Sequence, residues 1–437
     1  MSAAPVDQPA PAPADPVGAP LPLAGDAIPG TRQRWWFWPA FTIAWFATGI
    51  AQGMAGVAVP QLLKEWDAAS ATGSLSIILT VGGAAILVTT PVFGRLSDRS
   101  MSRLGLRRPW ILYGALAALV GYAVQGFATS LPVLALGTIL VLVGWGAVSM
   151  TVHTLFADQI RRRIRAIMSA ITGAATTVGI LVGVAATGVV ASLGQAAMFL
   201  IPGGIAVVLA LLLFLSLDDI HRTVPAPPLR WRAVRETFWI NPRRHPDFAW
   251  AWACRFFMTA SIISVTNYLY LTISSRFGID DPAEIAGVQT QATAAFTVMN
   301  LLMAFVFGVI SDRTGRRKPT VVIGALTSAV GLVVAVAFGD ITFFLIGIAL
   351  VGAGQGAYIA ADVALMTECL PSTEEAGKDL GIVALAYLLP GIVVPVFGYF
   401  LTRIGSPTGE NFLALYIAAV LMAVLAAVTV TRVKAVR

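Results

Sequence analysis

The chain has 437 residues, of which 57% are hydrophobic and only 12% are charged, and a water-soluble protein with this balance could not cover its surface with polar groups. Its net charge of +7 would suggest nucleic acid in a soluble protein, but in a membrane protein the position of each basic residue matters more, and no nucleic-acid partner is expected. The two cysteines, Cys254 and Cys369, fall within or at the end of apolar segments, which argues against a disulfide framework or a zinc site.

Residues 1–34 are predicted to form a disordered cytoplasmic tail, because they are rich in Pro and Ala and contain no long apolar core. The rest of the chain divides into twelve apolar segments, each near the roughly 20 residues that a membrane-spanning helix needs. The predicted spans are Trp36 to Leu62, Gly73 to Phe93, Trp110 to Phe127, Leu131 to Phe156, Ala166 to Leu193, Ala197 to Leu217, Phe248 to Ile273, Ile285 to Ile310, Thr320 to Phe338, Thr342 to Met366, Leu380 to Leu401 and Phe412 to Thr431.

This pattern predicts an all-α membrane protein of two six-helix bundles, residues 35–217 and 248–431. A polar segment, 218–247, is predicted to connect the bundles as a cytoplasmic loop, and residues 432–437 form a C-terminal cytoplasmic tail. The connecting loop is expected either to lie as a surface helix in the anionic membrane interface or to be a plain linker.

The distribution of basic residues gives the orientation. Of the 29 Lys and Arg residues, 25 fall on the side of the predicted spans that carries both termini. Only Lys64, Arg276 and Arg403 fall on the other side, and Arg255 lies within the seventh span. Because cytoplasmic loops carry the excess of basic residues, we expect a multi-pass protein of the cell membrane with both termini in the cytoplasm.

A repeated loop divides the chain into equivalent halves. After the second span the chain reads GRLSDRSMSRLGLRRPW from Gly94, and after the eighth it reads GVISDRTGRRKP from Gly308. The two loops are 214 residues apart, and the acids ending the fourth and tenth spans, Asp158 and Glu368, are 210 apart. Repeated six-helix halves are typical of transporters that rock around a central site.

This loop resembles the signature of the major facilitator superfamily, and the resemblance covers nearly all of residues 36–431. The longer first copy, together with HTLFADQI from His153 and ALMTECLPSTEEAGKDLG from Ala364, is similar to the glycoside, pentoside and hexuronide cation symporters and the sucrose carriers. The resemblance implies alternating access, a small-molecule substrate with a proton as co-substrate, no cofactor and a monomeric protein.

The resemblance also implies gate contacts at the cytoplasmic side. Asp98 would face the start of the eleventh span near Lys378, and Asp312 would face the start of the fifth near Ala166. Within each half, an Arg after the loop glycine would meet the acid that ends the fourth or tenth span: Arg107 or Arg108 with Asp158, and Arg316 with Glu368. The alternative is that these loops serve only to set topology.

Ionisable groups at bilayer depth are costly and face a cavity or one another. In the tenth span Gln355, Tyr358 and Asp362 recur at spacings of three and four, and in the seventh span Arg255 and Tyr270 lie on a similar polar stripe with Thr259 and Thr266. At about 1.5 Å per residue, Arg255 and Asp362 lie roughly 12 Å and 9 Å from the cytoplasmic ends of their helices. We therefore predict an ion pair beside the pathway, with a purely structural pair as the alternative.

The first half offers Trp45 and Gln52 in the first span and a stripe of Trp145, Ser149 and His153 in the fourth. Aromatic faces with amide and hydroxyl groups in an apolar cleft suit a sugar or another polyol. His153 could also titrate near neutral pH. Each of these residues could instead serve only packing.

Departures from the sugar carriers leave the coupling ion open. The embedded aspartate of the sucrose carriers would fall near Leu142, and the first two spans contain no carboxylate, so a sodium site is not expected. Coupling would use His153, Asp158 or Asp362, or the protein is a facilitator.

Antiporters of the superfamily that the chain resembles usually carry a Gly-Pro break in the fifth span. This chain has none there, which disfavours a drug or metabolite exporter. A non-transporting partner or sensor is disfavoured by the intact loops. No nucleotide-binding loop, catalytic carboxylate pair or metal-ligand cluster appears, so we predict neither an enzyme nor a metal site.

Overall fold

The computed structural model describes residues 33, 35–160, 164–221, 245–369, 376–406 and 408–434. Apart from Gln33, the predicted N-terminal tail lies outside the described residues, as do most of the connecting loop and the last three residues. In the described part of the chain all regular structure is helical, and twelve helices are long and apolar enough to cross a membrane. The predicted number of spans is confirmed.

The helices run as follows: α1 Phe37–Trp66, α2 Ala71–Asp98, α3 Arg108–Gly126, α4 Leu131–Asp158, α5 Arg165–Val190, α6 Gln195–Ser216, α8 Pro246–Thr266, α9 Leu269–Phe277, α10 Pro282–Thr314, α11 Arg317–Ala337, α12 Ile341–Glu368, α13 Ala376–Leu388, α14 Pro390–Leu401 and α15 Phe412–Thr431.

Two predicted spans are interrupted, and several others, among them α2 and α10, extend further than predicted. The seventh span divides into α8 and α9 at Asn267 and Tyr268, and the eleventh divides into α13 and α14 at Leu389, just before Pro390. Proline has no backbone N–H and cannot continue the hydrogen-bond ladder of the preceding helix. Helices α2 and α10 run on to Asp98 and Thr314, so that Asp98 and Asp312 lie in the last turns of helices rather than in a loop.

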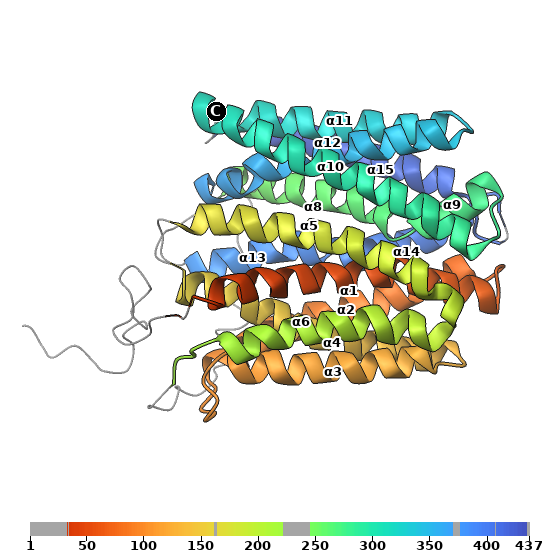
Figure 1. The fold of residues 1–437 in the computed structure, drawn as a ribbon. Helices are drawn as coiled ribbons and strands as arrows, with labels where there is room; N and C mark the ends of the chain where they lie inside the picture. The colour runs from red at the N-terminus through yellow and green to blue at the C-terminus, as the bar shows by residue number, and fades with distance from the viewer. Residues whose placement is uncertain are drawn as a thin grey trace, which may run out of the picture.

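The helices run side by side along the molecule (Figure 1) and pack chiefly within two groups, α1–α6 and α8–α15. Between the groups, α2 packs on α14 and α5 on α10. The first and last described residues, Gln33 and Lys434, lie at one end of the bundle. Gln33 donates to Gln159 after α4 and to the carbonyl of Asp218 after α6, and the N–H of Lys434 donates to Asp247 at the start of α8.

We call this end the basic end, because the Arg-rich loops after α2 and α10 lie there. We call the other end the opposite end. The loops that contain Asp67, Gly278 and Gly409 lie at the opposite end.

Helices α1 and α5 approach so closely that glycine is required at their contact. A Cβ atom on Gly49 would lie 2.2 Å from the carbonyl oxygen of Thr176, and one on Gly179 would lie 2.2 Å from that of Phe46. Small residues at such contacts let helix backbones touch and gain packing and weak Cα–H contacts. The first group of helices therefore depends on the absence of side chains here.

Replacing Gly49 with Val should destabilise the protein, because the added carbons have no space between the two backbones. Overpacking of a helix contact costs about 1–3 kcal/mol. Thermal unfolding of the purified protein in detergent would show a clear loss of Tm. Gly173→Ala on the exposed face of α5, where no atom lies within 4 Å of the new Cβ, is the matched control and should not lower the Tm. Equal Tm values for Gly49→Val and the wild type would contradict this account.

Candidate functional site

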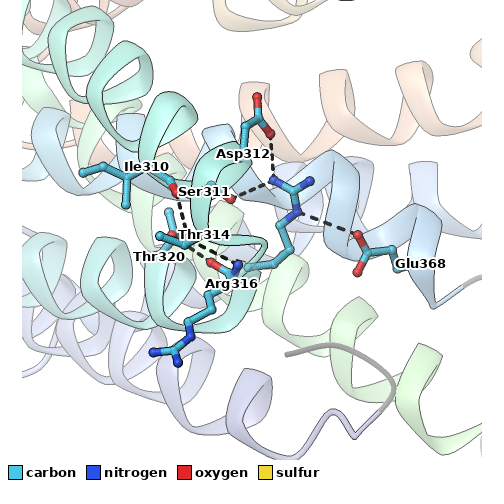
Figure 2. A network of polar contacts seen from close by, with 8 residues as sticks. Ile310, Ser311, Asp312, Thr314, Arg316, Thr320 and Glu368 are labelled. Carbon is cyan, nitrogen blue, oxygen red and sulfur yellow. Dashed lines mark hydrogen bonds and ion pairs between the residues drawn. The ribbon is translucent and has the colours of Figure 1, made fainter.

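The loop between α10 and α11 is organised around Arg317. Its Nη1 donates to Oδ1 of Asp312 over 2.9 Å and to Oγ of Ser311 over 2.8 Å. Its Nε lies 3.7 Å from Oε1 of Glu368 at the end of α12. Figure 2 shows Asp312 and Glu368 reaching this guanidinium from two sides. One arginine thus joins the ends of three helices of the second group.

The prediction that Arg316 meets Glu368 is wrong by one residue. Figure 2 shows the Arg316 side chain directed away from Glu368. The hydrogen bonds of Arg316 with Thr314 and Thr320 are made by its backbone. Gly315 has φ +65° and turns the chain sharply between α10 and α11, so the residue directly after it points away from α12. Both loops lead to a proline, and Arg107 and Arg317 each stand two residues before it. Aligning the loops on this proline, instead of on the glycine, would have selected Arg317.

The first loop uses its counterpart, Arg107, in the same way. Its Nη1 donates to Oγ of Ser97 over 2.8 Å, as Arg317 does to Ser311. Arg108 contacts α6: its Nε donates to the carbonyl of Phe214, and its guanidinium lies 4.8 Å from the Phe214 ring centre. The predicted contact of Arg107 or Arg108 with Asp158 stays a prediction, because the Asp158 side chain lies outside the described residues.

The predicted contacts between the two groups remain untested. Asp312 is 78% exposed and pairs with Arg317 in its own group. The side chains of Asp98, Asp158, Ala166 and Lys378 lie outside the described residues.

Sequence analysis missed Asp219, which follows α6. Its Oδ2 accepts hydrogen bonds from the backbone N–H groups of Arg107 and Arg108 over 2.5 and 2.8 Å, at the start of α3. Burial raises the pKa of the Asp219 carboxyl, against the lowering effect of these hydrogen bonds. Gly105, with φ +107°, lies against the carboxylate, where a Cβ atom would collide with it. An acid after a predicted span and a glycine in the loop were visible in the sequence, but nothing there indicated that they meet.

The predicted contact between Arg255 and Asp362 is confirmed. Nη1 of Arg255 in α8 lies 2.8 Å from Oδ2 of Asp362 in α12, and the hydroxyl of Tyr358 donates to the other carboxylate oxygen over 2.6 Å. The side chain of Asp362 is 9% exposed and that of Arg255 is 22% exposed. A buried carboxylate is thus held by one cation and one hydroxyl, and the cation is partly exposed. Its role in transport stays a prediction.

In the first group, Trp45 and His153 pack against each other. Their ring centroids are 4.5 Å apart, and Phe156 lies 5.7 Å from Trp45. Nδ1 of His153 donates to the carbonyl of Ser149 over 2.7 Å, which leaves Nε2 as the acceptor of a neutral ring. Nε1 of Trp45 is buried without a hydrogen-bond partner in the described structure. An unmet donor and an available acceptor therefore lie side by side.

The structure separates the remaining candidates from this pair. Nε1 of Trp145 donates to the hydroxyl of Tyr122 in α3 over 2.6 Å, so Trp145 holds two helices together. Tyr270 is on α9, beyond the break that the sequence did not predict, and is fully buried. Gln52 is exposed, seven residues along α1 from Trp45 and on the same face. The amide oxygen of Gln355 is buried without a described partner.

At the opposite end the two groups are bonded together. Nζ of Lys64, at the end of α1, donates to Oγ of Ser274, to the carbonyl of Ile279 over 3.2 Å and to Asp280 over 3.0 Å. In the described structure the other side-chain hydrogen bonds between the groups are Ser76 to Tyr268 and Gln289 to the carbonyl of Gly56. All of these residues lie nearer the opposite end than the basic end.

Residues 41–290 and 277–436 match the family model of the Major Facilitator Superfamily. A structure of a bacterial homolog to the human lysosomal transporter Spinster, inward-facing and unoccupied, has a TM-score of 0.69 and 14% identity, covering 91% of this chain and 95% of that one. The inward-facing and occupied form of the same protein has a TM-score of 0.67 and 15% identity, covering 92% of this chain and 96% of that one. A structure of a mutant of the nucleoside transporter NupG has a TM-score of 0.68 and 12% identity, covering 90% of this chain and 99% of that one. No curated protein matches the chain.

Replacing Arg317 with Gln should destabilise the second group more than replacing Arg316 with Gln. Arg317 joins three helix ends, whereas the Arg316 side chain points away from them. The expected difference is about 1 kcal/mol, the upper part of the range for partly exposed ion pairs, and thermal unfolding in detergent measures it. A larger effect from Arg316→Gln would show that the side chains are assigned in the wrong order.

Proposed function

The chain belongs to the major facilitator superfamily, and we propose that it is a secondary transporter that moves a small polar solute across the cell membrane by alternating access. The observation that carries this proposal is the Arg255, Asp362 and Tyr358 cluster inside the membrane-spanning part. Charged groups at this depth mark solute or proton pathways. We place the basic end in the cytoplasm, because 25 of the 29 Lys and Arg residues fall on that side.

The contacts between the groups support access from the basic end. Lys64 and Gln289 join the groups at the opposite end, whereas Asp312 at the basic end bonds within its own group. In an alternating-access cycle the Lys64 contacts would break as the opposite end opens. Asp312 and Asp98 would then make the contacts with the other group that the resemblance implies.

We propose that the solute is a sugar or a related polyol. Trp45 and His153 offer an aromatic surface, a donor and an acceptor, and the exposed amide of Gln52 lies further along the same face of α1. A buried donor without a partner costs about 1–3 kcal/mol. A solute hydroxyl that accepts from Trp45 would remove this cost, so these residues favour a ligand rich in hydroxyl groups.

We further propose that Asp362 exchanges the proton. Arg255 favours the ionised carboxylate, and burial favours the protonated one. Anything that draws the partly exposed Arg255 away would therefore promote proton uptake by Asp362. Binding of the solute and protonation would thus be linked through one ion pair, which is the requirement for coupled transport.

Uptake by proteoliposomes tests this function. With an inward proton gradient, a labelled mono- or disaccharide from a panel should accumulate above its external concentration. Asp362→Asn should abolish the accumulation, because the amide cannot exchange a proton, yet should still allow downhill movement. Asp340→Asn is the control, since the exposed Asp340 caps α12 at the opposite end and Asn caps equally well.

Gradient-driven accumulation by Asp362→Asn would refute the role of that carboxyl. Failure of every sugar, together with gradient-driven extrusion of a cationic dye, would favour the exporter instead.

Replacing Lys64 with Ala should open the opposite end more often, because three acceptors on the second group lose their donor. A cysteine introduced at Gln52 would then react several-fold faster with a membrane-impermeant maleimide applied from the periplasmic or external side. Asp340→Asn in the same background should leave the rate unchanged. A rate unaffected by Lys64→Ala would show that these hydrogen bonds do not hold the end shut.

A further inference from the structure

A groove runs between α2 and α14, on the surface where the two groups of helices meet. The helices are in contact at its inner end, where a Cβ atom on Gly83 would lie 2.6 Å from the carbonyl oxygen of Gly391. Because Pro395 has no N–H, it leaves that carbonyl without its usual partner within the helix. Toward the opposite end a groove opens between the helices. It is lined by Ser76, Ile77, Thr80, Val81, Pro395, Val396, Tyr399 and Phe400.

The groove faces lipid and is apolar. Ile77 is 47% exposed and Phe400 is 63% exposed on its rims. The one buried hydroxyl of the lining, on Ser76, is bonded to the hydroxyl of Tyr268 and to the carbonyl of Thr72. The lining therefore has little polar surface to offer, and this suits a hydrocarbon chain.

A cation lies at the outer mouth of this groove. Arg403 is one helical turn beyond Tyr399, and its guanidinium lies 3.8 Å from the Tyr399 ring centre and donates to the Tyr399 carbonyl. It also crosses Gly73, one turn before Ile77, where a Cβ atom would lie 2.7 Å from Nη2. The arginine thus bridges the two helices directly above the apolar lining.

Arg403 differs from the other basic residues of its side. Lys64 is paired with Asp280, and Arg276 donates to the carbonyls of Val336 and Phe338. Among the described residues no carboxylate lies within ion-pair distance of Arg403. A guanidinium beside an aromatic ring at the membrane surface, with most of its donors unused, is suited to an anionic phosphate.

We propose that this groove binds an anionic phospholipid, with its phosphate on Arg403 and one acyl chain along the lining between α2 and α14. A free phosphate would contact only the arginine, and an uncharged lipid would contact only the groove. A site with both features therefore selects a molecule that has a phosphate and an acyl chain. Because α2 and α14 belong to different groups, the bound lipid stabilises the arrangement in which the opposite end is closed. It therefore acts as a regulator of the conformational equilibrium.

Native mass spectrometry and thermal unfolding of the full chain in detergent test this site. Phosphatidylglycerol should be retained and should raise the Tm, whereas phosphatidylcholine should do so more weakly and inorganic phosphate should not. Arg403→Gln should weaken phosphatidylglycerol binding about fivefold, as expected for one basic residue at the membrane surface. Arg403→Lys should restore much of the binding, and Arg313→Gln at the basic end is the matched control.

A second variant keeps the arginine and removes the space. Val396→Trp should fill the groove and lower phosphatidylglycerol retention without changing the charge. Equal retention and equal Tm gains in wild type, Arg403→Gln and Val396→Trp would show general solvation by lipid and overturn the proposal. A Tm gain from inorganic phosphate alone, lost in Arg403→Gln, would assign the site to a free anion and would also overturn it.

Discussion

The bilayer imposes one requirement on which the rest of this structure depends: each backbone N–H and C=O must find its partner within the protein. A helix meets that requirement by itself, because its backbone hydrogen bonds are made within one segment. In the described part of the chain the membrane-spanning segments are helices. Helix association must then come from close backbone approach rather than from burial against water. The Gly49 and Gly179 contact joins α1 to α5 in this way, and the Gly83 and Gly391 contact joins the two groups. The lack of water at this depth also applies to side chains, and it explains why Arg255, Asp362 and Tyr358 are tightly paired.

The number and the place of the spans could be predicted because they depend on composition averaged over about 20 residues, which tolerates local error. The pairing of Arg255 with Asp362 was predictable for a related reason. Two ionisable groups at similar depth in a low-dielectric medium have few other partners. Neither inference required knowledge of which helices touch, and both agree with the structure.

Predictions that depended on the direction of one side chain were less successful. Arg316 was chosen over Arg317 because it directly follows the loop glycine. The turn at Gly315 reverses the chain within one residue and directs Arg316 away from Glu368, and a spacing rule does not describe that rotation. Trp145 lies on a polar stripe with His153, but eight residues of α-helix rotate one side chain about 80° from the other, which turns Trp145 toward Tyr122. The break at Asn267 has no proline to mark it, so Tyr270 was assigned to a continuous helix.

Asp219 gives the connection between the two groups a definite starting point. The backbone N–H of Leu106 donates to the carbonyl of Ile220, and the ring of His221 lies 3.1 Å from the carbonyl of Arg103, so residues 219–221 are fastened to the loop before α3. The tether between the groups is therefore measured from residue 222 and not from the end of α6. At about 3.4 Å per residue this shortens its reach by roughly 17 Å. A shorter tether raises the effective concentration of one group at the surface of the other, so this capping carboxylate also limits how far the two groups of helices can separate.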